Sequence, residues 1–164
     1  MEKTPSSQYK IRFSDCDLFG HLNNSRYLDY MINAREDHLS EHYNFDLTEH
    51  YKNGSGWVVG SHEIIYMIAA VYNEVVRIQS SLLLAEDDYL FVETIMSDAK
   101  KTHLKAVMRT KLVHVNITTG RKEKHDVPFL EWVKTIVNTE IDPNIPLQQR
   151  IKDLRDGLKN SIAL

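Results

Sequence analysis

Residues 13–43 of this 164-residue chain read FSDCDLFGHLNNSRYLDYMINAREDHLSEHY, a polar stretch followed by a helical pattern. From Asn24 to about Tyr43, apolar and aromatic side chains recur every three or four residues, which predicts an α-helix. Asn24 or Ser25 is placed to cap its start. The apolar and aromatic residues cover much of the helix circumference, which indicates that protein surrounds the helix on most sides.

Four strand-like runs follow the helix, separated by short connections. They span residues 57–72, 74–85, 89–98 and 103–117. Val76, Ile78 and Leu82 fall on alternate positions of the second run, the pattern of a half-buried strand. Connections this short require antiparallel pairing, because parallel strands need long crossovers. With a further short strand at 9–14, the sequence predicts an α+β protein in which a curved antiparallel sheet wraps one long helix.

The run at 57–71 is apolar on both of its faces. Trp57 and Ile65 lie on one face, and Ile64 and Tyr66 lie on the other. A strand of this kind needs cover on both faces. In a sheet of a single layer, this indicates that copies of the chain associate.

Two more helices are expected after the strands. Pro128 stands near the first position of a short apolar segment, which favours a helix, with another strand as the alternative. Leu147 and Ile151 begin an apolar series at helical spacing, which predicts an amphipathic helix packed on the body or on a partner subunit. The expected boundaries are 1–140 for the main domain and 141–164 for a C-terminal helical extension of the same domain.

Length, charge and cysteine content narrow the class of protein. The chain has the length of one domain, and its formal net charge of −3 provides no broad basic field for nucleic acid. No run approaches the ~20 apolar residues of a membrane helix. The N-terminal segment also lacks the apolar core of a signal peptide. Cys16 is the single cysteine, so no intramolecular disulfide can form. We therefore expect a cytoplasmic protein that binds neither nucleic acid nor membranes.

Two aspartates flank this cysteine. Alternate residues of an extended segment share a face, so Asp15 and Asp17 are expected on one side, where repulsion would raise the pKa of one carboxyl group. The alternative is that both carboxylates cap the helix or face solvent in a turn. Cys16 lies between two negative charges that would raise the pKa of its thiol, so packing is favoured over nucleophilic attack.

Gly20 stands where a sharp turn, or a close approach of the backbone to a ligand, is expected. The amides after it lead into the helix, where unpaired N–H groups and the helix dipole favour negative charge. A carboxylate beside such a turn would provide a general base or nucleophile together with an oxyanion hole, as acyl chemistry requires. His21 is either a second acid–base group or an ordinary hydrogen-bonding residue.

Other patterns carry less information. His38 and His42 have the spacing of a helical metal pair but no third ligand, so we expect a solvated helix face and no metal site. The sequence contains neither a glycine-rich nucleotide loop nor a G-x-S-x-G motif. Positive charge gathers late in the chain, either on a solvated strand face or as a contact for a polyphosphate. The residues are Lys100, Lys101, Lys105, Arg109, Lys111, Arg121, Lys122 and Lys124.

The segment DCDLFGHLNNSRYLDYMINAR (15–35) resembles the D-x-D-x-x-G-H-[VL]-N-N-x-x-Y…A-R signature of hotdog-fold acyl-CoA thioesterases, in the hydroxybenzoyl-CoA thioesterase-like group. The matching residues are Asp15, Asp17, Gly20, His21, Asn23, Asn24, Tyr27 and Arg35. A looser resemblance covers residues 8–130. It implies the hotdog fold, with subunits paired edge to edge and an active site at their interface. The chain departs from the family at 67–70, where a proline is usual, and at Asn33, where an acidic residue is common.

This resemblance implies an enzyme that hydrolyses an acyl-CoA to a carboxylic acid and CoA, without a cofactor other than the CoA of the substrate. Asp17 would activate water or attack the thioester carbonyl, and the amides around Gly20 and His21 would polarise that carbonyl. Three further residues would shape the site: Asn23, Asn24 and Tyr27. A homodimer would be the minimal unit, with a tetramer as the alternative. An acyl-ACP thioesterase, a hotdog hydratase or dehydratase, and a non-catalytic acyl-CoA-binding module stay open as alternatives.

Overall fold

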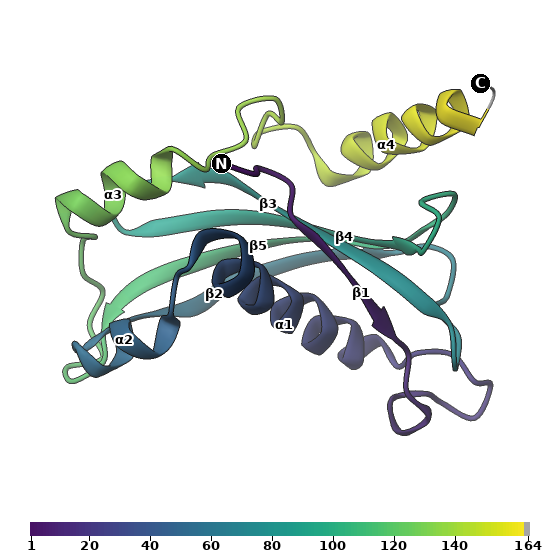
Figure 1. Ribbon diagram of the computed structural model, residues 1–164, viewed down its shortest axis with the longest axis horizontal. Coiled ribbons are helices and arrows are strands. Elements are labelled where there is room, and N and C mark those ends of the chain that lie inside the picture. The colour runs from purple at the N-terminus through teal and green to yellow at the C-terminus, as the bar shows by residue number, and fades with distance from the viewer. Residues whose placement is uncertain (163–164) are drawn as a thin grey trace.

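The computed structural model describes residues 1–162, with side chains described through Leu158 (Figure 1). The strands are β1 (Ser6–Lys10), β2 (Ser55–Tyr66), β3 (Val75–Ala85), β4 (Tyr89–Asp98) and β5 (Leu104–Asn116). The helices are α1 (Asn24–Tyr43), α2 (Leu47–Lys52), α3 (Val127–Lys134) and α4 (Leu147–Ile162), with a 3-10 turn, η1, at Phe13–Asp15. The sheet is antiparallel, in the order β1-β3-β4-β5-β2. With α1 across one face of this curved sheet, the predicted hotdog fold is confirmed.

Helix α1 has the bounds expected from the sequence. Its buried side chains form one stripe along the sheet: Tyr27, Met31, Ala34 and His38. They face a core that includes Ile78, Met96 and Met108 of the sheet. The N-cap is Asn23, not Asn24 or Ser25 as expected, and its side chain makes no capping hydrogen bond. Neither α1 nor any other helix in residues 1–162 is long and apolar enough to cross a membrane.

The four later strands confirm the predicted runs. The predicted ends of the run at 57–72 and of the first strand at 9–14 were wrong. β2 ends at Tyr66, and the chain then forms an irregular loop over 67–74 instead of continuing the strand. β1 ends at Lys10, and residues 13–15 form the turn η1 instead of extended chain. A 3-10 turn has about three residues per turn, so alternate side chains no longer share a face.

Two short helices close one end of the space between α1 and the sheet. The sequence did not indicate α2, whose first turn is capped by the Asp46 carboxylate. α3 confirms the predicted helix, with Pro128 in its first turn and the Asp126 carboxylate as its cap. The ring of Phe45, just before α2, stacks on Trp132 of α3 with 5.1 Å between centroids. Aromatic contacts therefore connect two segments that lie far apart in the sequence.

Helix α4 lies on the opposite side of the sheet from α1 (Figure 1). Leu147 of α4 is buried against Val107 of β5. Glu93 of β4 is only 1% exposed, and its two carboxylate oxygens contact Arg109 of β5 at 3.1 Å and Arg150 of α4 at 3.0 Å. Because it joins both arginines, this buried carboxylate attaches α4 to the sheet.

Strand β2 is an edge of the sheet in the described chain. Two neighbouring valines are exposed on it, Val58 at 50% and Val59 at 46%. The register with β5 shifts between Val59 and Ser61. An apolar edge with unpaired backbone groups is a template for pairing with another strand.

Candidate functional site

An open pocket of about 470 Å³ lies at the N-terminal end of α1. Its walls come from the loop before α1, the first turns of α1 and the residues around the end of β2. The lining residues are Asp17, His21, Leu22, Asn23, Asn24, Tyr27, Tyr66, Met67 and Ala69. The site residues singled out from the sequence are all among them except Gly20, which forms the adjacent turn. The structure therefore brings the predicted group together around one pocket.

The Asp17 carboxylate is held by the turn that it precedes. Its Oδ1 accepts hydrogen bonds from the backbone N–H groups of Phe19 at 2.8 Å and His21 at 3.0 Å. Gly20 occupies the left-handed region at φ +73°, which lets the chain reverse there. Among the backbone and side-chain groups that the structure describes, the second carboxylate oxygen, Oδ2, has no hydrogen-bond or ion-pair partner. One oxygen thus fixes the side chain, and the other is left for a water molecule or a substrate.

The amides of Gly20 and His21 do not fit the predicted oxyanion hole, because both already donate hydrogen bonds within the turn. The Gly20 N–H donates to the Asp17 carbonyl at 3.0 Å, and the His21 N–H donates to the Asp17 side chain. The next unpaired donors are the N–H groups of Asn24 and Ser25, which have no acceptor in the described part of the chain, as expected for the first turn of a helix. Asn24 also lines the pocket, so the start of α1 can supply donors for an oxyanion.

Tyr27 and Tyr66 form the inner wall of the pocket. Their rings meet edge to face, with 5.1 Å between centroids. The Tyr27 hydroxyl accepts a hydrogen bond from the Ala70 N–H at 2.8 Å, and the Tyr66 hydroxyl donates to the Asn24 carbonyl at 3.1 Å. Burial raises the pKa of Tyr27, which keeps its hydroxyl neutral. Tyr27 therefore fixes α1 against the 67–74 loop, and Tyr66 fixes the end of β2 against the start of α1.

A buried ion pair holds this loop, and sequence reasoning missed it. Lys105 Nζ lies 2.7 Å from Glu74 Oε1 and donates to the Ala69 carbonyl at 3.1 Å. The other oxygen of Glu74 accepts a hydrogen bond from the Val71 N–H at 2.9 Å. The pair joins a loop residue to a residue of β5, so the periodicity of the sequence contains no signal for it.

The two aspartates of the motif face different sides, contrary to expectation. Asp15 accepts a hydrogen bond from the Tyr30 hydroxyl at 2.9 Å and lies 3.8 Å from Arg26 Nε. It lines a separate polar pocket that does not include Asp17. The turn η1 explains the separation, since Asp15 is its last residue. Asp15 is thus a structural residue.

Cys16 behaves as the sequence predicts. Its thiol donates to the Arg12 carbonyl at 3.3 Å, and its side chain packs against the α1 core. Burial raises the pKa of the thiol, and the charges of Asp15 and Asp17 raise it further. The interpretation of Cys16 as a packing residue is confirmed.

The expectation of a solvated face at His38 was wrong. Its ring is fully buried, and Nδ1 is 2.8 Å from the Ser80 hydroxyl oxygen. Burial, followed by the nearby charge of Arg35, lowers the pKa of His38 to about 4. Among the residues that the structure describes, no group of three His, Cys, Asp or Glu side chains could hold a metal ion.

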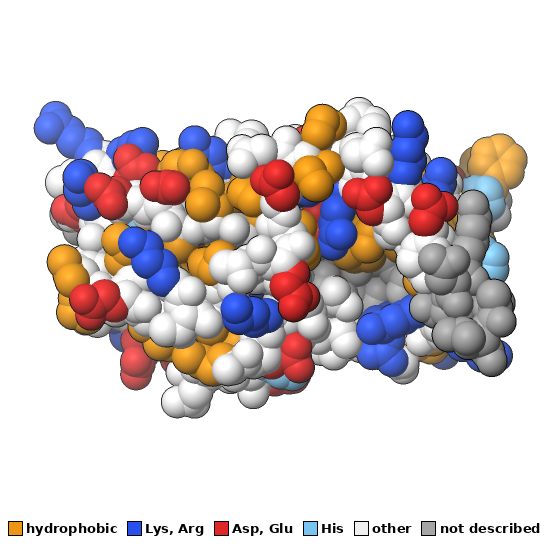
Figure 2. All heavy atoms as spheres, turned by 90° about the horizontal axis from the view of Figure 1, so that it is seen from above, with side chains coloured by type: hydrophobic (Ala, Val, Ile, Leu, Met, Phe, Trp, Pro, Cys, Tyr) orange, Lys and Arg blue, Asp and Glu red, His pale blue; other side chains and the backbone are white. Residues whose placement is uncertain are grey.

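The late cluster of basic residues is largely committed to contacts within the chain. Ion pairs join Lys105 to Glu74, Arg109 to Glu93, Lys122 to Asp88 and Lys124 to Asp87. Lys111 Nζ lies 4.0 Å from the centroid of the Tyr89 ring. Seen from the α4 side, Lys and Arg alternate with Asp and Glu instead of forming one basic patch (Figure 2). These five side chains are therefore poor candidates for a polyphosphate site.

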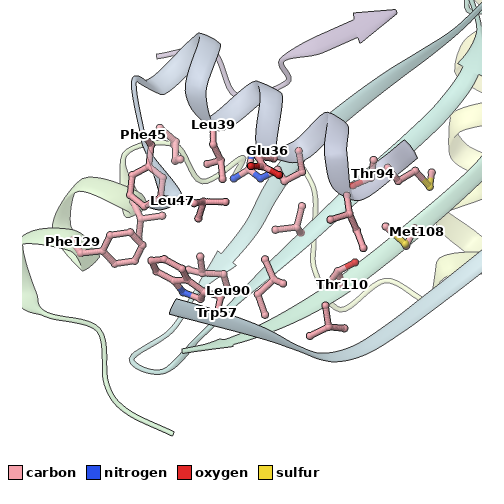
Figure 3. Close-up of a pocket in the computed structure, with 18 of the residues that line it drawn as sticks. Glu36, Leu39, Phe45, Leu47, Trp57, Leu90, Thr94, Met108, Thr110 and Phe129 are labelled. Atoms are coloured by element: carbon pink, nitrogen blue, oxygen red, sulfur yellow. The ribbon is translucent and has the colours of Figure 1, made fainter. Parts of the chain in front are cut away.

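A second cavity, of about 240 Å³, lies farther along α1 between the helix and the sheet (Figure 3). Its lining is mainly apolar, with Leu39, Phe45, Trp57, Leu90 and Phe129 around the space in Figure 3. Helices α2 and α3 close one end of it. The sequence did not reveal this cavity, because its aromatic residues come from segments that only the folded chain brings together.

Comparisons with known proteins place this geometry in a family. Residues 11–137 match the family described as the thioesterase-like superfamily. A search of curated protein sequences gave no significant match.

Solved structures of thioesterases share the fold. A DHNA-CoA thioesterase from Staphylococcus aureus has 18% identity and a TM-score of 0.73, over 80% of this chain and 87% of that one. A 1,4-dihydroxy-2-naphthoyl-CoA thioesterase from Synechocystis has 17% identity and a TM-score of 0.72, over 84% and 98%. The 12:0-ACP thioesterase from Umbellularia californica has 12% identity and a TM-score of 0.73, over 86% of this chain but 54% of that one. At these identities, the likeness establishes the fold.

Proposed function

The chain belongs to the thioesterase-like superfamily, and from this premise we propose that it hydrolyses an acyl-CoA thioester with Asp17 as the catalytic carboxylate. One observation carries the proposal. The pocket at the start of α1 contains a carboxylate with one unengaged oxygen and, at Asn24, an unpaired backbone donor at a helix N-terminus. A nucleophile or base beside an oxyanion donor is the minimal equipment for acyl transfer to water.

In the general-base path, Asp17 Oδ2 takes a proton from water while the water oxygen attacks the thioester carbonyl carbon. The carbonyl oxygen gains negative charge, and the N–H of Asn24 donates to it. The intermediate then collapses, the C–S bond breaks, and the proton held by Asp17 passes to the departing CoA thiolate. The products are the free carboxylic acid and CoA.

In the nucleophilic path, Asp17 Oδ2 itself attacks the carbonyl carbon and expels the CoA thiolate, which leaves a mixed anhydride. Water then hydrolyses the anhydride and regenerates the carboxylate. A single turnover in ¹⁸O-labelled water separates the two paths. Attack by water on the thioester places the label in the product alone, whereas hydrolysis of the anhydride at its enzyme carbonyl places the label in Asp17 and leaves the product unlabelled. Label in Asp17 therefore identifies the nucleophilic path.

CoA is the proposed carrier in preference to acyl carrier protein. This chain spans nearly the whole length of the two CoA thioesterases, but only 54% of the ACP thioesterase. Lys100, Lys101 and Arg121 form no ion pair within the part of the chain that the structure describes, so these three residues are the candidates for phosphate contacts. Cys16 as the single, partly buried thiol fits a reducing compartment, and we place the enzyme in the cytoplasm.

A homodimer paired through β2 is the proposed minimal unit. The edge of β2 is unpaired, and the exposed Val58 and Val59 would gain cover from a second copy. Pairing at this edge would bring a partner near Tyr66, which lines the Asp17 pocket. A tetramer built from two such dimers is the alternative.

The test is steady-state hydrolysis of a panel of acyl-CoA and acyl-ACP substrates, with the released thiol detected. Hydrolysis of acyl-CoA at least tenfold faster than of the matched acyl-ACP supports the proposal, and the reverse preference contradicts it. Enoyl-CoA substrates, followed by loss of the conjugated absorbance, test the hydratase alternative. Tight binding measured by calorimetry, without hydrolysis of any member of the panel, would identify a binding module instead.

A further inference from the structure

The cavity between α1 and the sheet has one feature that an apolar pocket does not need, a partly buried cation. Arg35 projects from α1 into its lining. The guanidinium lies over the Tyr43 ring at 5.8 Å, and Nη1 is 3.4 Å from the Ser80 hydroxyl oxygen. Within the described residues, no carboxylate lies within ion-pair distance of it. Burial lowers the pKa of Arg35, the direction expected for a cation without a counter-charge.

A deeply buried arginine of this fold shows the contrast. Arg109 is 4% exposed, and it is paired with the Glu93 carboxylate and with backbone carbonyls of Pro143 and Ile145. Burial of an unpaired charge has a high desolvation free energy, and this cost falls when a group of opposite charge pairs with it. Arg35 has most of its five N–H donors available, and its position on the cavity lining directs a partner into the cavity.

The buried neighbours of Arg35, Ser80 and His38, add no negative charge. Ser80 is fully buried, and its hydroxyl is shared with the neutral ring of His38. Glu36 also lines the cavity, but its residue is exposed and forms no ion pair with Arg35 within the part of the chain that the structure describes. The lining therefore contains one cation, Arg35, beside the exposed Glu36, and the rest of the wall is mainly apolar.

We propose that this cavity binds an apolar chain that ends in a carboxylate, with the carboxylate on Arg35. The proposal rests on the proposed function in one respect: the chain would be the acyl group of the substrate, which makes the substrate a thioester of a dicarboxylic acid. From Asn24 to Arg35, α1 rises about 16 Å, a length that an extended acyl group and the two side chains can span. A free fatty acid offers the same chemistry, and the experiment separates the two sources.

The chain provides its own probe of this cavity. Trp57 and Trp132 are its two tryptophans, and both line the cavity. Tryptophan fluorescence therefore reports binding without any need for hydrolysis, and Asp17→Asn can be used throughout. The ligands are decanoate and decyl alcohol, which share a chain length and differ in the carboxylate.

We expect decanoate to bind at least tenfold more tightly than decyl alcohol, because only the carboxylate can form a charge-assisted hydrogen bond with the guanidinium. Arg35→Met should remove this preference, whereas Arg35→Lys should keep part of it. Arg155→Met, which removes an exposed positive charge from α4, is the matched control and should change nothing. Equal binding of the two ligands by the wild-type protein would overturn the proposal, even if Arg35→Met failed to fold.

Hydrolysis then identifies the source of the carboxylate. A kcat/KM at least tenfold higher for the mono-CoA thioester of decanedioic acid than for decanoyl-CoA supports a dicarboxylic substrate. A preference for decanoate in binding, without this preference in hydrolysis, contradicts the dicarboxylic substrate and assigns the site to the free acid. Failure of all hydrolysis would refute the proposed function and leave the binding result intact.

Discussion

Oδ1 of Asp17 accepts a hydrogen bond from the N–H of His21 at 3.0 Å, so the carboxylate and the turn at Gly20 form one unit. The orientation of Asp17 thus depends on a backbone conformation that glycine adopts without strain. The second oxygen faces the pocket because the first is fixed in this way.

Substitution of Gly20 should therefore lower activity through geometry. Gly20→Ala places a side chain at φ +73°, where nothing lies within 4 Å of the new Cβ, so the cost is conformational, about 1 kcal/mol. We expect kcat to fall on the order of tenfold as Asp17 shifts. Gly120→Ala is the matched control, since Gly120 has φ +67° and equally open space. Similar losses of kcat in the two variants would argue against a role for the turn in positioning Asp17.

The Lys105–Glu74 pair should prove essential to the 67–74 loop. Lys105→Met leaves the partly buried Glu74 without its counter-charge, and we expect about 3 kcal/mol lower stability in urea unfolding. Glu74→Gln in the same chain should recover part of that loss, because the two residues are coupled. Strictly additive effects would mean that the pair contributes no interaction energy of its own.

Stability should fall in mild acid because of His38. Its pKa is lowered to about 4 in the folded protein, so the unfolded state binds the proton more tightly than the folded state does. Its neutral form therefore contributes stability above pH 6.5, and this contribution is lost as the pH falls from about 6.5 to 4. We expect His38 to account for about 2 kcal/mol of the loss between pH 7 and pH 5. His38→Gln should show a smaller pH dependence in denaturant unfolding, and an unchanged slope would exclude His38 as its cause.

A charge on the edge of β2 should dissociate the proposed dimer. Val59 is 46% exposed on this edge, and Val59→Lys would place a charge where the partner strand pairs. Sedimentation should find a dimer for the wild-type protein and a monomer for the variant. Val127→Lys, at an exposed position that begins α3, should stay dimeric. A wild-type protein that sediments as a monomer would rule out the edge-paired unit.

Hydrophobic periodicity in the sequence was sufficient to predict the type and bounds of the elements that bury one regular face. The bounds of α1 were predicted to the residue, and the alternation of the later strands identified β3, β4 and β5 within two residues at each end. These elements bury one continuous stripe or face, so their apolar residues recur with the period of a helix or a strand. The six-residue helix α2 buries no residue completely and left no such pattern.

The site was predicted in composition but only partly in geometry. Sequence placed Asp17, His21 and Asn24 together because they lie close along the chain, and in the structure they line one pocket. It placed Asp15 on the same side because it assumed extended chain, and the turn η1 breaks that alternation. Lys105 and the apolar cavity depend on contacts between distant segments, which no local pattern records.

The central claim is that Asp17 performs the chemistry, and the most direct test compares two neighbouring aspartates. Hydrolysis of the best acyl-CoA is measured for the wild-type protein, Asp17→Asn and Asp15→Asn, with the released thiol as the readout. We expect Asp17→Asn to lose on the order of 10²-fold or more in kcat, whereas Asp15→Asn, which alters the contact with Tyr30 outside the pocket, should keep most of the activity. An Asp17→Asn variant as active as the wild-type protein would contradict the account.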